Sequence, residues 1–118
     1  MYHFLKADMR TQQGNEPPWV VGESRSITSA PVLCQVGYHA SSTVLGALEY
    51  APGPMLCEVE LTGIVLADKN KAVGQGRRLI AAVNVEQELH VFACDCAERA
   101  LPFFEAAHPN DKTPREAI

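Results

Sequence analysis

The chain has 118 residues and 47% of them are hydrophobic, which is the size and composition of a single globular domain. Its formal charge of -4 gives no positive field for DNA or RNA, so direct nucleic-acid binding is not expected. No segment approaches the roughly 20 continuous apolar residues of a membrane span, and the N-terminus has no signal-peptide core, so we expect a cytoplasmic protein without a membrane partner.

A short strand is predicted at the N-terminus. Over residues 2–7 the pattern places Tyr2 and Phe4 on one face and His3 on the other. Polar residues 8–18 follow as a loop, and the chain then returns to the core at Trp19.

A second buried strand is predicted over Val32–Val36. It ends at Gly37, whose missing side chain permits a bend or a close approach of two backbones. Tyr38 and His39 follow this bend directly.

A short helix comes next. Ser42 or Thr43 can cap its N-terminus, and residues 52–54, Pro-Gly-Pro, end it. Its apolar face consists of Val44, Leu45, Ala47, Leu48 and Ala51.

The clearest strand in the sequence is Met55–Thr62. Alternation places one face in the core and leaves Glu58 and Glu60 on the other. Gly63 predicts a bulge or kink. A further strand over Arg77–Val83 begins with basic residues, which can lie across from the two glutamates as a charge pair.

The longest helix is predicted to begin at Asn84, with Gln87 closing a capping box. Pro102 predicts a bend near its end, with Phe103 and Phe104 still packed, and His108 and Pro109 stop it. Its apolar face is predicted to contain Val85, Leu89, Phe92, Ala93, Cys96, Ala97 and Ala100.

The last residues read as the opening of another helix. Thr113 can be its N-cap, Pro114 its first residue and Glu116 the capping-box partner. A single turn is not stable alone in water, so this segment frays, docks on the body, or represents a natural truncation of a longer ancestor.

These elements predict an α+β fold, with a mostly antiparallel sheet, one short helix and one long C-terminal helix. We expect a single domain over 1–118, in which residues 1–83 form the sheet and short helix and residues 84–118 form the helical segment.

The cysteines and a helix histidine raise the question of zinc. His90 and Cys94 are four residues apart, but Cys96 is turned away from them, and a structural zinc site needs four converging ligands. We therefore expect no metal and no cofactor. Cys34 and Cys57 are interpreted as reduced thiols in the core.

Most of the chain, from Tyr2 to about Val83, resembles a family of uncharacterised domains found in phages, prophages and bacterial mobile elements. The motifs that carry the resemblance are Trp19–Gly22, Cys34–Ala40 (Cys-x-x-Gly-aromatic-His-Ala), Tyr50–Gly53 and Cys57–Gly63. The resemblance implies a genomic setting and a fold, and no chemistry.

The C-terminal part resembles a different group of proteins. From Phe92 to Ile118 the sequence is similar to the start of a helical region in bacterial immunity-like proteins. In those proteins the helix that begins with TPREAI continues.

A further resemblance is to ADP-ribosyltransferases, carried by Tyr2 and His3, by the corner Gly37–Ser41 and by the helix end Ala47–Ala51. Such enzymes hold a nicotinamide dinucleotide with the histidine and aromatic residues, and they orient a ribose hydroxyl with a glutamate on a later strand. Glu58 and Glu60 are the strand carboxylates that could take this part, although they come early in the chain.

The candidate site residues are therefore His39, Tyr38, His3, Glu58 and Glu60. His39 is the best of them, and its structural alternative is a hydrogen bond to the backbone around the preceding glycine. For the two glutamates the alternative is a solvated or arginine-paired sheet face.

Two functions from different classes follow. The first is protein-protein binding to a host protein or protein complex, for instance as an inhibitor of a host defence system such as an anti-CRISPR, and under it we expect no enzymatic activity. The second is an ADP-ribosyltransferase-like enzyme or nucleotide-binding protein. The second predicts that His3, His39 and Glu58 or Glu60 converge on one cleft.

Overall fold

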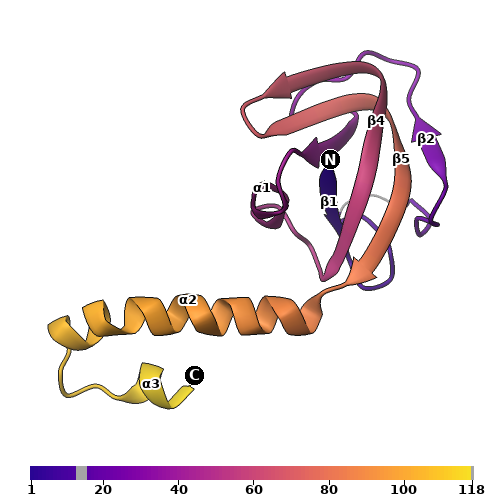
Figure 1. Ribbon diagram of the computed structural model, residues 1–118. Coiled ribbons are helices and arrows are strands. Elements are labelled where there is room, and N and C mark those ends of the chain that lie inside the picture. The colour runs from indigo at the N-terminus through magenta and orange to yellow at the C-terminus, as the bar shows by residue number, and fades with distance from the viewer. Residues whose placement is uncertain (13–15, 118) are drawn as a thin grey trace. The chain divides into compact units, whose positions relative to one another are not determined.

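The computed structural model describes residues 1–12 and 16–117. The chain divides into two compact units, Met1–Asn84 and Val85–Ile118. The first unit contains a five-stranded antiparallel sheet and a short helix, and the second contains two helices (Figure 1). The predicted α+β fold is confirmed.

The strands of the first unit pair in a closed ring. Its elements are β1 (Tyr2–Leu5), β2 (Ser24–Ser26), β3 (Tyr38–Ser41), α1 (Val44–Leu48), β4 (Met55–Asp68) and β5 (Lys71–Asn84). Strand β1 pairs with β3 and β4, and β5 pairs with the same two strands, while β2 adds to β5 beyond β3. The ring leaves an interior to which four strands contribute side chains.

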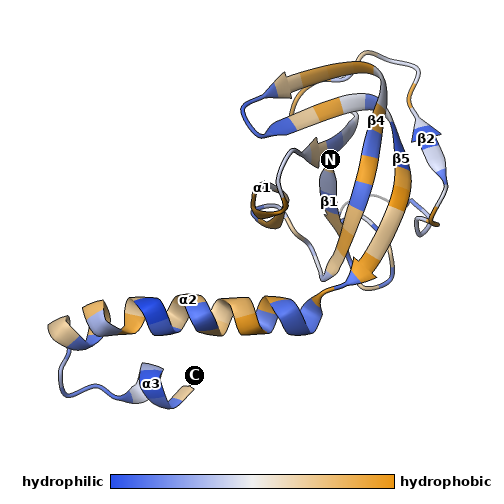
Figure 2. Ribbon diagram, in the orientation of Figure 1, coloured by the Kyte–Doolittle hydropathy of each residue, from blue (hydrophilic) through white to orange (hydrophobic). Residues whose placement is uncertain are grey.

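The hairpin of β4 and β5 supplies most of this ring. Cys57 and Val59 are buried and Glu58 is exposed, as the alternation predicts, and Figure 2 shows the change of hydropathy along both strands. The predicted bulge is confirmed at Gly63, where φ is 70° and the register shifts between Thr62 and Val65. The strand continues beyond the bulge to Asp68, because a bulge bends a strand without ending its pairing.

The core of the first unit forms where these strands meet the N-terminal segment. Trp19 is 3% exposed, so the return of the first loop to the core is confirmed. Cys57 is fully buried, as expected, and burial raises the pKa of its thiol to about 11. The largest fully buried side chains are Phe4, Leu5, Leu79, Val73 and Cys57.

The helix α1 begins as the sequence predicts. Thr43 is its N-cap, and the Thr43 hydroxyl oxygen accepts a hydrogen bond from the Gly46 N–H at 3.0 Å. The helix ends at Leu48, before the Pro-Gly-Pro segment over 52–54.

The segment Val32–Val36 is not a buried strand, and this prediction was wrong. Val32 and Val36 hydrogen-bond to each other and close a tight loop, which leaves both side chains exposed. Cys34 lies at the tip with a φ of 65° and is exposed, so its assignment to the core was also wrong. The following strand begins only at Tyr38.

The predicted charge pair across β4 and β5 does not form. Arg77 lies opposite Leu61 and its side chain points inward, with 3% of the residue exposed. Arg78 lies opposite Glu60, but the ion pairs of the described residues include none between these two strands. Adjacent residues of a strand face opposite sides, so only one of the two arginines can reach the glutamate face.

The second unit begins with α2 (Glu86–Ala107), whose N-cap is Val85, one residue later than the predicted Asn84. Asn84 remains in β5, where it pairs with Met55, and Val85 occupies the N-cap position without a side-chain hydrogen bond. The helix runs through Pro102, and its predicted end at His108 is confirmed by the hydrogen bond from the His108 N–H to the Phe104 carbonyl.

The apolar residues of α2 lie mostly at the surface. Among the described residues of this helix only Leu101 is buried, and Phe103 is 81% exposed, so the prediction that Phe103 packs was wrong. Phe104 is half-buried, and its ring centroid lies 4.8 Å from that of His108. Neither α2 nor any other described helix has the length and hydropathy that crossing a membrane requires.

The short helix α3 (Thr113–Ala117) docks on α2. The Arg115 guanidinium donates hydrogen bonds to both carboxylate oxygens of Glu105, at 2.9 and 2.5 Å. The N-terminus of α3 is capped by Asp111, which accepts a hydrogen bond from the Thr113 N–H, and not by Thr113 itself.

Candidate ligand-binding site

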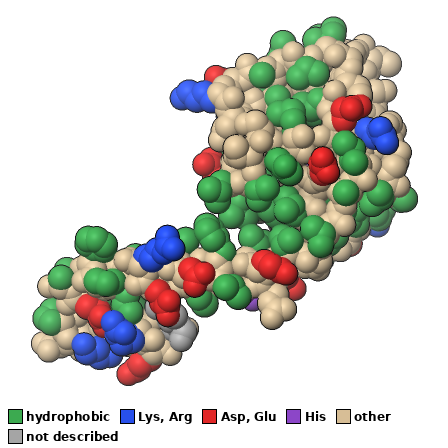
Figure 3. Space-filling model, in the orientation of Figure 1, with side chains coloured by type: hydrophobic (Ala, Val, Ile, Leu, Met, Phe, Trp, Pro, Cys, Tyr) green, Lys and Arg blue, Asp and Glu red, His purple; other side chains and the backbone are tan. Residues whose placement is uncertain are grey.

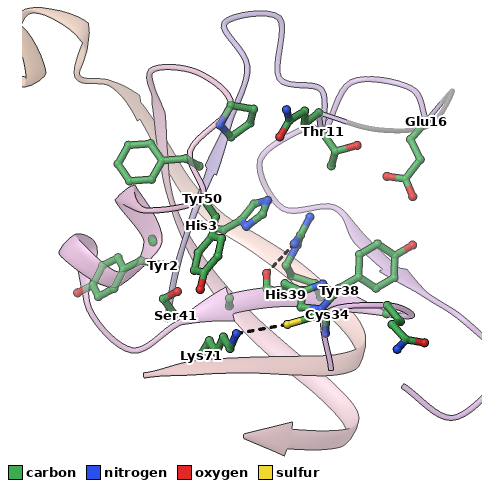
Figure 4. Close-up of a pocket in the computed structure, with 18 residues that line it drawn as sticks. Tyr2, His3, Thr11, Glu16, Cys34, Tyr38, His39, Ser41, Tyr50 and Lys71 are labelled. Atoms are coloured by element: carbon green, nitrogen blue, oxygen red, sulfur yellow. Dashed lines mark hydrogen bonds between the residues drawn. The ribbon is translucent and has the colours of Figure 1, made fainter. Parts of the chain in front are cut away.

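A pocket of about 460 Å³ opens in the first unit (Figure 4). Its walls come from β1, β3, α1, the start of β5 and the loops before β2 and β3. Side chains that can carry a charge line it, among them His3, Glu16, Cys34, His39, Lys71 and Arg77.

Three of the five predicted site residues line this pocket. His3 comes from β1, while Tyr38 and His39 come from β3, and the two strands pair at Tyr2 and Ser41. His3 and His39, which lie 36 positions apart in the sequence, therefore reach one cavity, which is part of the convergence that the nucleotide-binding interpretation predicts.

The two predicted glutamates lie elsewhere. Glu58 and Glu60 are exposed and line a separate depression with Val59 and Ile80. Figure 3 shows acidic side chains at the surface of the first unit among hydrophobic ones. The alternation of β4 sends Cys57 and Val59 inward, so the glutamates that alternate with them, Glu58 and Glu60, face away from the pocket.

Arg77 is the central residue that sequence reasoning missed. It is 3% exposed, and its Nη1 donates a hydrogen bond to the His39 carbonyl at 2.8 Å. Its guanidinium carbon lies 4.8 Å from the Trp19 ring centroid and 5.2 Å from that of Tyr38. No carboxylate of the described residues forms an ion pair with it, and its other N–H groups have no hydrogen-bond partner there.

A second arginine, next to Arg77, does have carboxylate partners. Arg25 is the cross-strand neighbour of Arg77 and lies over the same Trp19 ring, at 4.2 Å. Its guanidinium donates to the Glu23 carboxylate and to the backbone carbonyls of residues 17–18. Of the two guanidinium groups, Arg77 is therefore the one without a carboxylate partner among the described residues.

The burial of Arg77 does not remove its charge at neutral pH. Desolvation lowers its pKa to about 10. The carboxylate of Glu16, which also lines the pocket, lies 3.4 Å from Arg25, so it is already partnered. The interior of the pocket consequently presents a cation.

The two histidines are neutral at pH 7. Burial lowers the pKa of His3 to about 3, with further contributions from Arg77 and His39. Burial also lowers the pKa of His39, followed by Arg77 and Lys71. His39 Nε2 accepts a hydrogen bond from the Cys34 N–H at 2.9 Å, which places the ring proton on Nδ1. This is a backbone hydrogen bond beside the glycine bend.

The low pKa of His3 makes the stability of the first unit depend on pH. The folded-state pKa lies near 3 and the ordinary value is 6.5, so this stabilisation is complete above pH 6.5 and is lost as the pH falls toward 3. We expect wild type to lose about 2 kcal/mol more unfolding free energy than His3→Gln between pH 7 and pH 5. Urea unfolding followed by Trp19 fluorescence measures this difference.

The matched control for this prediction is His90→Gln, since His90 is an exposed histidine of the helical unit. That variant should keep the wild-type pH dependence. Equal pH dependence of wild type and His3→Gln would show that burial of His3 does not hold its ring neutral.

A thiol and an amine meet at the rim of the pocket. Lys71 Nζ donates a hydrogen bond to Cys34 Sγ at 3.3 Å, drawn as a dashed line in Figure 4, and lies 5.6 Å from the Tyr50 ring centroid. This hydrogen bond is the first cause of the raised pKa of Lys71, so the amine is protonated at neutral pH.

Comparison of the chain with models of protein families, with curated proteins and with solved structures gives no match. Within the described part of the chain, no group of three or more His, Cys, Asp or Glu side chains is placed to hold a metal ion. The chemistry of the site therefore follows from its own residues, which offer a buried cation, neutral imidazoles and aromatic rings.

The sequence did contain a signal for Arg77. Residues 77 and 79 have the same phase in β5, and Leu79 is 2% exposed. Placing Leu79 in the core places Arg77 there too, while Arg78 and Ile80 face outward. Nothing comparable points to Lys71 and Cys34, because a loop closed by its own backbone bridge brings Cys34 to the pocket.

Proposed function

We propose that this protein binds a small anionic ligand of the nucleotide class in the pocket of its first unit. The observation that carries the proposal is Arg77, a buried guanidinium that lines a cavity and has no carboxylate partner among the described residues. Its free donors are suited to a phosphate or carboxylate group.

A buried charge without a partner destabilises a folded protein. The effective cost of removing a guanidinium from water is of the order of several kcal/mol. Two ring contacts and one carbonyl offset part of this cost for Arg77. An anion that enters the pocket can accept hydrogen bonds from the remaining N–H groups of Arg77. Little conformational entropy is lost on binding, because this side chain is already held in place.

The other walls favour a ligand with a ring and polar groups. Tyr38 and Tyr50 offer aromatic surface, and the neutral imidazoles of His3 and His39 offer donors and acceptors without charge. A nucleotide presents a planar base, hydroxyl groups and a phosphate, which is the combination that these walls can accept.

The proposal is binding rather than ADP-ribosyl transfer. The transferase interpretation needs a strand glutamate in the same cleft as the histidines, and Glu58 and Glu60 face away from it. Glu16 does line the pocket, but its carboxylate is held by Arg25. The described residues around the cavity thus include a recognition group for an anion and no free carboxylate for orienting a ribose.

Titration calorimetry with adenosine, AMP and ADP tests the proposal. We expect AMP and ADP to bind about tenfold or more tightly than adenosine, because only they carry the group that pairs with Arg77. The double variant Glu58→Gln/Glu60→Gln is the control and should bind AMP as wild type does. Absence of binding by all three ligands, or equal binding of adenosine and AMP, would count against a nucleotide site.

Protein-protein binding is the second candidate function, and the exposed apolar residues of α2 favour it. Phe92 is 44% and Phe103 is 81% exposed, and exposed apolar surface is a feature of interaction sites. Affinity purification from the host should recover a stoichiometric partner with wild type and not with Phe92→Ser/Phe103→Ser. A host-defence target, anti-CRISPR inhibition and a mobile-element origin stay predictions.

A further inference from the structure

We propose that Cys34 is a covalent capture site for small anionic disulfides, with which it forms a mixed disulfide at the rim of the pocket. This goes beyond reversible ligand binding, and it rests on the proposed anionic pocket for part of its selectivity. The sulfur, the neighbouring ammonium group and the buried guanidinium all belong to the same cavity.

The loop around Cys34 holds the sulfur in place. Its backbone is fixed by the bridge between Val32 and Val36 and by the hydrogen bond from the Cys34 N–H to His39 Nε2. Cys34 has a φ of 65°, a conformation that is uncommon for residues other than glycine. The thiol is exposed at this fixed tip, so a disulfide from solution can reach it.

The charges beside the sulfur favour an anionic reagent. Lys71 Nζ lies 3.3 Å from Sγ, and reactive cysteines are characteristically exposed and close to a cationic side chain. Arg77 supplies a second positive charge inside the pocket, with donors that no described residue occupies. A carboxylate on the incoming disulfide therefore meets a cation at the rim or in the interior.

The other thiols lack this setting. Cys57 is fully buried and its pKa is raised to about 11, which keeps it unreactive. Cys94 and Cys96 are exposed on α2, but no hydrogen bond of the described residues joins either sulfur to a basic side chain. The contrast identifies Cys34 as the thiol that should react first with an anionic disulfide.

The reaction is a thiol-disulfide exchange. The Cys34 thiol loses its proton to solvent, and the Sγ lone pair attacks one sulfur of the small disulfide. A bond forms between Sγ and that sulfur while the original sulfur-sulfur bond breaks, and its electron pair leaves with the second sulfur as a thiolate. Cys34 is oxidised, the departing half is reduced, and no further oxidant is needed.

Three disulfides of matched size test the inference, namely dianionic dithiodipropionate, neutral hydroxyethyl disulfide and dicationic cystamine. Peptide mass spectrometry measures the rate of modification at Cys34 in the native full-length chain and in the chain unfolded in urea. We expect the ratio of the modification rate by dithiodipropionate to that by cystamine to be about tenfold larger in the native chain than in the unfolded chain. Hydroxyethyl disulfide should fall between them.

Two variants make the result specific. Lys71→Met should remove most of the native preference for the anionic disulfide, and Cys34→Ser should abolish rapid modification. A native ratio no larger than that of the unfolded chain, or one unchanged in Lys71→Met, would overturn the inference. Calorimetry with AMP reports separately on the proposed nucleotide site, so failure of one proposal is distinguished from failure of the other.

Discussion

Replacing Arg77 by methionine is expected to weaken AMP binding by about 100-fold or more while the first unit remains folded. Methionine occupies a similar volume against Trp19 and Tyr38, so the packing of the two rings is largely retained. The phosphate, in contrast, loses its charged donors in an interior where water cannot replace them. Calorimetry gives the affinity, and urea unfolding of the same variant gives its stability.

The stability measurement separates recognition from folding. A buried charge without a counter-ion contributes little net stability, so Arg77→Met should unfold within about 2 kcal/mol of wild type in the absence of ligand. Arg77→Lys keeps a charge but loses the planar fork, and its affinity should fall between those of wild type and Arg77→Met. Arg78→Met, at the adjacent exposed position, is the control and should bind as wild type does. Wild-type affinity in a folded Arg77→Met variant would contradict the role given to Arg77.

Where local pattern determines structure, the sequence was sufficient. The alternation of β4, the bulge at Gly63 and the cap at Thr43 each follow from neighbouring residues, and each is confirmed. The helix start at Asn84 was wrong for a reason outside local pattern, since pairing with Met55 keeps that residue in β5. Strand pairing of distant residues outweighs a favourable capping sequence.

The candidate site was predictable only in part. His3 stands out as a chemical residue on a predicted strand and His39 as one in the corner after the glycine bend, and the pairing of β1 with β3 brings both to the pocket. The other residues of the pocket depend on strand register. A shift of one position along β5 would replace the buried Arg77 by the exposed Arg78. Glu58 and Glu60 lie on the outward face of β4, as the alternation predicts, and for that reason they do not join the histidines in the pocket.

Gly37→Ala tests whether the bend before His39 holds the pocket together. Gly37 has a φ of 117°, and a methyl group there would lie 2.7 Å from Val73 Cγ2 and 2.9 Å from the Gly74 carbonyl oxygen. Val73 is fully buried and Gly74 is held in β5 by its pairing with Tyr38, so neither can retreat cheaply. Left-handed strain and overpacking together should cost about 3 kcal/mol or more in urea unfolding of the first unit.

Gly22→Ala provides the matched comparison, because Gly22 also has a positive φ, 93°, but a methyl group there would meet no atom within 4 Å. Its unfolding free energy should fall only by the cost of the left-handed backbone conformation, about 1 to 2 kcal/mol. Trp19, the single tryptophan, is buried in the same unit and reports unfolding of both variants. The difference between the losses of unfolding free energy in the two variants measures the steric clash at Gly37. Equal losses would show that β3 and β5 can separate at the bend without cost. Because β3 carries Tyr38 and His39 into the pocket, a large difference would also predict weaker AMP binding by any Gly37→Ala protein that still folds.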